Sequence, residues 1–273
     1  MEPYGADAAV EVGAMLFTLV DPHKGHEVAY NRWYERDHFY SGCMIGPWLF
    51  AGRRWVATRE LKDLRSPTDV PAEAAVAAPL DAGSYLATYF IHKGHEPEHF
   101  AWTTKQVFEL YAHGRGFDER EHAHTCLYFF TGAEQRDPDG VPAHMALDHP
   151  YGGLISLHLD RAEGVDQAAL QDWAADVGRG LLFEGAGIDQ VLNWRPIIPK
   201  GSEGDAPMKL GSGPGTRQRS LQLLFTPGDP RSQIERVRSY ADRLTSDGIG
   251  VVRLVAPFIP TVPGTDLYTD QLW

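Results

Sequence analysis

One order of predicted elements occurs twice along this chain of 273 residues. Short apolar runs that end at Gly, Pro or Asp predict four strands in each half. Longer stretches with helix start and stop residues predict two helices in each half. The order is strand, helix, strand, strand, helix, strand both times. Phe17 and Trp33 stand 16 positions apart, as do Leu157 and Trp173, which predicts that the first helix of each half packs a tryptophan onto its sheet.

Each half has the element order of a ferredoxin-like unit, in which two helices cover one face of an antiparallel sheet. The predicted strands are 14–20, 49–59, 84–91, 124–130, 153–159, 189–197, 219–226 and 249–259, and the predicted helices are 25–41, 97–114, 166–184 and 229–248. Pro and Gly near residues 147–152 indicate a boundary. We therefore expect an α+β protein of two tandem βαββαβ repeats, residues 1–147 with the active site and residues 148–273 with a C-terminal tail. Long irregular segments, 64–83 and 199–218, connect the second strand to the third in each half.

Composition excludes several classes of function. Lys and Arg number 25 against 37 Asp and Glu, a formal charge of −12, and no basic stripe is present, so a nucleic-acid partner is not expected. No apolar stretch reaches the roughly 20 residues that span a bilayer. The acidic N-terminus has no signal-peptide pattern. We expect a cytoplasmic protein with no membrane partner.

The first predicted helix contains the pattern N-x-W-Y-x-x-x-H, formed by Asn31, Trp33, Tyr34 and His38, and an Arg53-Arg54 strand follows it. With the two fused repeats, this pattern resembles the dimeric α+β barrel superfamily, and in particular its EthD-like members. The resemblance implies that the antiparallel sheets form an α+β barrel, closed within one chain by the tandem repeat. Such families include cofactor-free monooxygenases, lactone isomerases, polyketide cyclase or decarboxylase-like enzymes and haem-binding enzymes. A homodimer remains an open alternative.

Helical spacing gives the first helix two faces that are not solvent-facing. Ala29, Trp33 and Tyr40 fall on a core stripe, whereas Tyr30, Asn31, Tyr34 and His38 fall on a neighbouring polar arc. A polar inward arc predicts a cavity between the helix and the sheet. A shift of 140 positions maps Tyr34 to Ala174 and His38 to Gly178, so the second half lacks the arc. This difference predicts that the first half carries the chemistry.

The resulting hypothesis is an enzyme without a tightly bound organic cofactor, acting on a hydrophobic aromatic or polyketide-like carbonyl or enol compound. His38 is the expected general acid or base, and Tyr34 and Asn31 would bind an enolate oxygen. The reaction would be a proton transfer, as in an isomerase, cyclase or lyase. The expected substrate-binding residues are Arg53, Arg54, Tyr30, His124, Tyr128 and Trp273. Alternatives are a cofactor-free monooxygenase, a metal- or haem-dependent enzyme, and a non-catalytic ligand-binding barrel.

The sequence HKGHE occurs at 23–27 and at 92–96. We expect the first and third strands of a repeat to be adjacent and parallel, so that the four histidines approach each other at one end of the sheet. A divalent metal bound by His23, His26, His92 and His95 is therefore an alternative. For haem, His38, His99 or His124 is an alternative axial ligand, although no c-type haem motif is present.

Overall fold

The computed structural model describes residues 9–197 and 218–273. Its strands are β1 (Val12–Pro22), β2 (Leu49–Val56), β3 (Tyr85–His92), β4 (Arg120–Gln135), β5 (Gly153–Arg161), β6 (Gln190–Pro196), β7 (Arg219–Thr226) and β8 (Gly250–Pro260). The α-helices are α1 (Glu27–Trp33), α2 (Arg59–Lys62), α3 (Glu96–Ala112), α4 (Gln167–Trp173), α5 (Arg179–Phe183) and α6 (Ile234–Ser246). Two π-helical segments, η1 (Tyr34–Met44) and η3 (Ala174–Gly178), and two short 3₁₀ turns, η2 (Ala143–Met145) and η4 (Pro230–Gln233), complete the elements. All but one residue of the predicted segment 199–218 lie outside the described residues.

The eight strands pair in a closed cyclic order, β1-β3-β2-β8-β5-β7-β6-β4. Every pairing is antiparallel. The first four strands are ordered β4-β1-β3-β2 and the last four β8-β5-β7-β6, so each half contributes the same arrangement. The predicted α+β class with an antiparallel sheet is confirmed. That the two halves are tandem repeats, divided near residue 147, stays a prediction.

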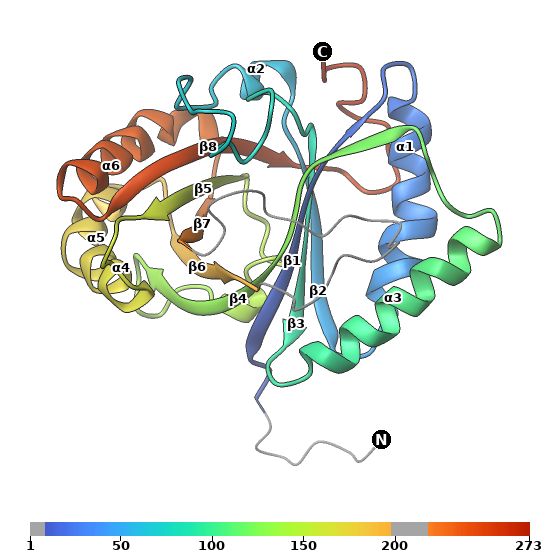
Figure 1. Cartoon of the computed structure of the whole chain (residues 1–273), viewed down its shortest axis with the longest axis horizontal. Coiled ribbons are helices and arrows are strands. Elements are labelled where there is room, and N and C mark those ends of the chain that lie inside the picture. The colour runs from blue at the N-terminus through green and yellow to red at the C-terminus, as the bar shows by residue number, and fades with distance from the viewer. Residues whose placement is uncertain (1–8, 198–217) are drawn as a thin grey trace.

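The helices lie in two groups on opposite sides of the strands (Figure 1). Helices α1 and α3 lie on one side, and α4, α5 and α6 on the other. Three hydrophobic clusters follow from this arrangement. One cluster lies between α1–η1 and the first-half strands, a second between α4–α6 and the second-half strands, and the third fills the space that the strands enclose.

Strand β5 shows why these strands appear in the sequence as unbroken apolar runs. Leu154 belongs to the enclosed cluster, whereas Ile155 and Leu157 pack against the helices of the second half. Both faces of the strand are therefore covered, and the polar–apolar alternation of a half-exposed strand is absent. The polar residue His158 shares the enclosed face with Leu154, because side chains of alternate residues lie on one face.

The helix termini follow the sequence signals. Pro97 lies in the first turn of α3, and Gly114 follows its end at φ +69°, a backbone conformation that glycine adopts without strain. The Asp166 side chain accepts a hydrogen bond from the backbone N of Ala169 at 2.8 Å and caps α4.

The predicted first helix is not one regular helix. It is α-helical to Trp33 and π-helical from Tyr34, and the corresponding helix of the second half changes at the same point, after Trp173. A π-helix forms i→i+5 hydrogen bonds and has wider turns. An angular step of about 100° per residue therefore no longer places His38 correctly.

One expectation about the sheet is wrong. Strands β1 and β3 are adjacent but antiparallel, because the β1–α1–β2 crossover places β3 between two strands that run the other way. The loop after β1 and the loop after β3 consequently lie at opposite ends of the sheet. The two HKGHE segments do not meet.

Candidate functional site

The structure brings together three residues predicted for the site, Asn31, Tyr34 and Arg54. Arg54 Nη1 donates to Asn31 Oδ1 at 2.9 Å, and its guanidinium lies 4.5 Å from the centroid of the Tyr34 ring. Asn31 Nδ2 donates to the backbone oxygen of Thr265 at 2.8 Å, and the Tyr34 and Tyr89 hydroxyls are 2.9 Å apart. These polar groups therefore join α1 to β2 and the C-terminal segment, and η1 to β3.

His38 lies half-buried against aromatic rings. Its ring stacks on Trp33 with 5.3 Å between centroids and meets the edge of Tyr34 at 4.9 Å. Burial, with the positive charge of Arg120, lowers the pKa of His38 to about 3. Within residues 9–197 and 218–273, none of the three hollows described is lined by Asn31, Tyr34 or His38. The catalytic role assigned to these three residues stays a prediction.

Arg53 and Tyr30 are held by the protein itself. Arg53 donates to the backbone oxygens of Leu147, His149 and Tyr151, which fastens the connector between β4 and β5 to β2. Tyr30 is fully buried, with the rings of Tyr34 and Tyr85 at 5.5 and 5.4 Å. Arg53 and Arg54 thus point to different surroundings, as strand alternation requires.

The second half has a structural reason for lacking the polar arc. A Cβ atom on Gly178, the counterpart of His38, would lie 2.8 Å from the Tyr240 ring. Gln171, the counterpart of Asn31, donates to the backbone oxygen of Thr131 instead. Tyr240 occupies the space that a histidine at position 178 would require.

The paired histidine loops are surface features at opposite ends of the sheet. His23 Nδ1 is 2.9 Å from Glu119 Oε2, and His26 Nε2 is 3.9 Å from the same atom. His95 stacks on Trp48 at 3.5 Å, and the His92 ring lies 5.5 Å from that of His95. Among the described residues, no group of three or more His, Cys, Asp or Glu side chains is placed to hold a metal ion. The four-histidine metal site is therefore not formed.

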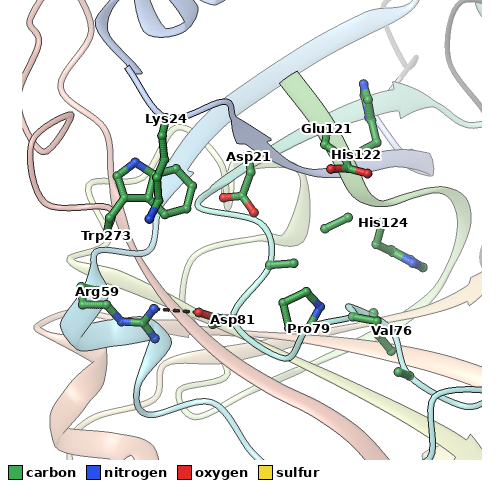
Figure 2. Close-up of a pocket in the computed structure, with 14 residues that line it drawn as sticks. Asp21, Lys24, Arg59, Val76, Pro79, Asp81, Glu121, His122, His124 and Trp273 are labelled. Carbon is green, nitrogen blue, oxygen red and sulfur yellow. Dashed lines mark hydrogen bonds and ion pairs between the residues drawn. The ribbon is translucent and has the colours of Figure 1, made fainter. Parts of the chain in front are cut away.

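The largest hollow described lies at the end of the sheet where β1 finishes and β4 begins. Figure 2 shows this rim cavity, which has a volume of about 650 Å³. Its lining residues are Asp21, Lys24, Arg59, Ala75, Val76, Ala78, Pro79, Asp81, Ala82, Glu121, His122, Ala123, His124 and Trp273. Two residues predicted from the sequence to bind substrate, His124 and Trp273, therefore line one cavity although they are far apart in the chain.

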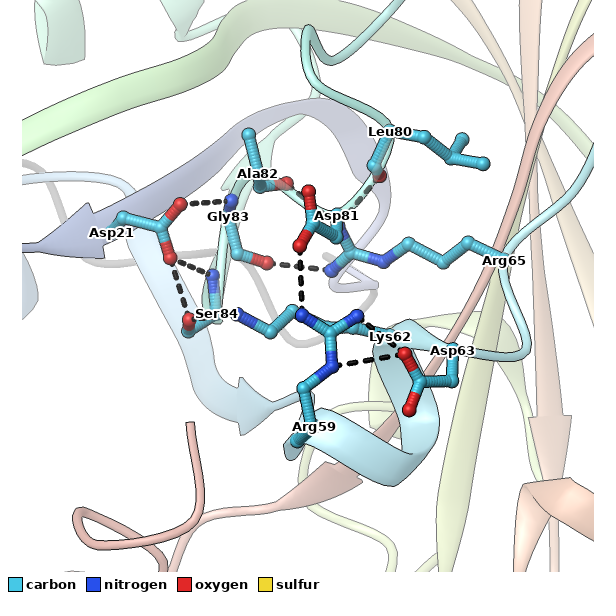
Figure 3. Close-up of polar contacts among 10 residues, drawn as sticks. All are labelled: Asp21, Arg59, Lys62, Asp63, Arg65, Leu80, Asp81, Ala82, Gly83 and Ser84. Atoms are coloured by element: carbon cyan, nitrogen blue, oxygen red, sulfur yellow. Dashed lines mark hydrogen bonds and ion pairs between the residues drawn. The ribbon is translucent and has the colours of Figure 1, made fainter. Parts of the chain in front are cut away.

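One wall of the rim cavity is the segment 64–83, which a buried guanidinium holds in place (Figure 3). Arg65 is 2% exposed and donates to the backbone oxygens of Leu80, Ala82 and Gly83 at 3.2, 2.6 and 2.6 Å. Asp21 accepts hydrogen bonds from the backbone N of Gly83 at 2.5 Å and of Ser84 at 2.7 Å. The wall is thus fixed to β1 by ordered polar contacts.

A polar chain leads from the rim cavity into the space enclosed by the strands. His124 Nε2 is 2.9 Å from the Tyr128 hydroxyl, and the His158 ring lies 5.4 Å from the His124 ring. Burial, with the nearby Arg219 guanidinium, lowers the pKa of His124 to about 3, and burial also lowers the pKa of His158. Both imidazoles are therefore neutral at physiological pH.

Sequence reasoning missed His158, and it did not identify which residues of the irregular segment 64–83 line a cavity. His158 is fully buried, and neither ring nitrogen has a hydrogen-bond partner in the described part of the chain. A signal for His158 existed, because the alternation of β5 places it on the face of Leu154 rather than of Leu157. The irregular segment offered no such periodicity.

Structural comparison identifies the fold. No family model and no curated protein matches the chain. A protein described as anthrone oxidase-like has a TM-score of 0.51 and 9% identity, covering 94% of this chain and 96% of its own. A provisionally assigned chlorite dismutase has a TM-score of 0.54 and 8% identity, covering 96% and 100%. These values show a shared ferredoxin-like α+β fold. They do not show the EthD-like assignment.

The expectation that no cofactor is involved is contradicted by the structural matches. A haem-binding protein from Thermus thermophilus is among the structural matches, at 12% identity and a TM-score of 0.46, covering 93% of this chain and 92% of its own.

The histidines considered as haem ligands do not fit that group. His99 Nδ1 and Nε2 are 2.8 and 3.0 Å from Pro47 O and Thr103 Oγ1, so both ring nitrogens are engaged. The His124 ring is 4% exposed and lies 5.9 Å from the Phe17 ring and 5.4 Å from the His158 ring. His38 is stacked on Trp33. The enclosed His158 has the Phe17 and His124 rings within 5.4 Å, which leaves no space for a macrocycle. We therefore derive no step through haem.

No helix in the described ranges is both long and apolar enough to cross a bilayer. Three expectations stay predictions: a cytoplasmic location, no nucleic-acid partner, and a possible homodimer.

Proposed function

We propose that the chain is an enzyme that acts on a small, planar aromatic ketone or phenol in the rim cavity. The observation that carries this proposal is the position of His124, a neutral imidazole that lines a cavity of about 650 Å³ and is hydrogen-bonded on its inner side to Tyr128. A cavity of several hundred Å³ with a few convergent polar groups is typical of small-molecule sites.

The lining favours a flat, weakly acidic aromatic compound. The Trp273 indole offers an aromatic face, and Val76 and Pro79 offer apolar contacts. Lys24 and Arg59 place positive charge at the same cavity, where it would stabilise an enolate or phenolate oxygen. Arg59 is anchored by Asp81 at 2.7 Å, so its position is set before substrate binds.

The proposed chemistry begins with proton removal from the substrate by His124 Nδ1, the ring nitrogen that is not bonded to Tyr128. Burial keeps this imidazole neutral at physiological pH, but the low pKa also makes it a weak base in the free protein. The anion that forms beside it stabilises the imidazolium by charge pairing in a largely buried site. The hydrogen bond to Tyr128 fixes the ring orientation, which makes Tyr128 a positioning residue.

Anthrone is a suitable probe because it combines a flat ring system, a carbonyl and an acidic C–H bond. Its anion reacts with dioxygen, and each anthrone converted into anthraquinone consumes one dioxygen and releases one water. One structural match is described as anthrone oxidase-like, which supports the choice of probe. Isomerisation, cyclisation and elimination begin with the same proton removal and are the second group of candidate reactions.

The test compares wild type, His124→Gln and His38→Gln by dioxygen uptake and anthraquinone absorbance, with protein-free buffer as the baseline. Loss of a general base costs roughly 10²-fold or more, so we expect His124→Gln to lower kcat/KM by at least that factor. His38→Gln is expected to retain wild-type turnover. Equal turnover in His124→Gln and wild type, or a wild type no faster than buffer, would refute the proposal.

A further inference from the structure

The last residue of α2 buries an amine next to the rim cavity. Lys62 is 2% exposed, and its Nζ donates to Ser84 Oγ at 3.0 Å. Lysine is rarely fully buried unless it is paired. Within residues 9–197 and 218–273 no carboxylate lies within ion-pair distance of this amine. The amine is therefore desolvated without a direct counter-ion.

The charged groups around Lys62 act in both directions. Burial lowers its pKa to about 8, and Arg65 and Arg59 act in the same sense, whereas Asp21 and Asp81 raise the pKa. A substantial fraction of the amine is therefore neutral near pH 8, while an exposed lysine titrates near 10.4. A neutral amine is the nucleophilic form.

A hydrogen-bonded chain connects this amine to a carboxylate at the cavity (Figure 3). Ser84 Oγ accepts from Lys62 and donates to Asp21 Oδ1 at 2.5 Å. Asp21 lines the rim cavity. A proton leaving the Lys62 ammonium thus has a direct route through the Ser84 hydroxyl to Asp21.

The Trp273 indole contacts both the amine and the cavity. Lys62 Nζ lies 4.4 Å from the centroid of the Trp273 indole, which itself lines the cavity. Trp273 is 43% exposed, and its indole donates a hydrogen bond to Glu27 Oε1 at 2.5 Å. Lys24 lies on the same ring at 5.2 Å. Among these contacts, the Trp273 indole is therefore the side chain that lies between the cavity and the amine.

We propose that Lys62 is a nucleophilic residue that forms an imine with a small aldehyde or ketone in the rim cavity, with Trp273 as the cover over it. The Lys62 nitrogen attacks the carbonyl carbon and forms a carbinolamine, which loses one water to leave a carbon–nitrogen double bond. Asp21, through Ser84, takes the proton that frees the amine. The inference uses the same cavity as the proposed function but does not depend on oxidation of an aromatic substrate.

Reductive trapping tests this inference on the full chain. The protein is incubated with benzaldehyde and borohydride at several pH values, and each lysine-containing peptide is quantified by mass spectrometry. We expect modification of Lys62 with a half-maximum near pH 8, and a pH profile that differs from that of the exposed Lys105, which serves as the surface reference. Trp273→Ala is expected to accelerate labelling of Lys62 and to leave Lys105 unchanged.

Two further variants keep the test decisive. Ser84→Ala retains the amine but removes the route to Asp21, and it is expected to slow labelling of Lys62. Lys62→Met should abolish the labelled peptide that forms near pH 8, while Lys105 is labelled as in the wild type. Labelling of Lys62 that follows Lys105 at every pH, or that Trp273→Ala leaves unchanged, would show that Lys62 only supports the fold. The readout involves no turnover of anthrone, so failure of either proposal is seen separately.

Discussion

Replacing Arg65 with methionine should remove the hydrogen bonds that hold the segment 64–83, the wall of the rim cavity, in place. Methionine retains most of the aliphatic volume but removes the donors that hold three carbonyl oxygens, of Leu80, Ala82 and Gly83. Arg65 is 2% exposed, so the side chain has little access to water in the folded state. The structure therefore predicts a large loss of stability at this position.

The magnitude follows from opposing contributions. A hydrogen bond to a charged group contributes about 1.5–3 kcal/mol, and three are lost. Removing a buried cation recovers several kcal/mol of desolvation free energy. We expect a net destabilisation of about 3 kcal/mol, a fall in Tm of roughly 6–12 °C for a chain of this size.

Arg59→Met is the matched control. Arg59 pairs with Asp63 and Asp81, but its side chain is 35% exposed, so the cost should stay below about 1 kcal/mol. Urea unfolding followed by circular dichroism measures both variants, and limited proteolysis of residues 64–83 reports on the wall. Equal destabilisation by the two substitutions would refute this account of the wall.

Two further predictions test the structure elsewhere. Gly83→Ala should lower the free energy of unfolding by about 2–4 kcal/mol, because Gly83 has φ +89° and a Cβ would lie 2.2 Å from Leu19 Cγ. The control Gly94→Ala, at φ +84° in open space, should cost about 1 kcal/mol in urea unfolding. Similar losses for the two substitutions would contradict the close contact with Leu19. Burial lowers the folded-state pKa of His158, so below about pH 6.5 the unfolded chain binds a proton that the native state does not, and the native state loses stability as pH falls. His158→Phe should reduce the slope of unfolding free energy against pH by up to about 1.4 kcal/mol per unit near pH 5, and an unchanged slope would show that His158 is protonated normally.

The strands and helices could be predicted from the sequence because their signals are local. Strand β5, for example, is predicted at 153–159 and observed at Gly153–Arg161. Trp33 and Trp173, predicted to pack on their sheets, are both buried there. Apolar runs with both faces covered, bounded by turn residues, depend little on the rest of the chain.

The location of the site could not be predicted in the same way. The π-helical stretch from Tyr34 invalidated the angular placement of His38, and nothing local in the sequence announces it. The rim cavity depends on contacts between distant segments, such as Trp273 with Lys62 and Asp21 with Gly83. The parallel pairing assumed for the histidine loops was an error of topology, which the antiparallel register of β1 and β3 corrects.

A crystal structure of the protein with anthrone bound tests most directly whether the rim cavity receives the substrate. The account predicts electron density for the ring system between the Trp273 indole and the His124 imidazole, with its oxygen toward Lys24 or Arg59. Density beside His38 and Tyr34, between the first helix and its sheet, with the rim cavity empty, would contradict it.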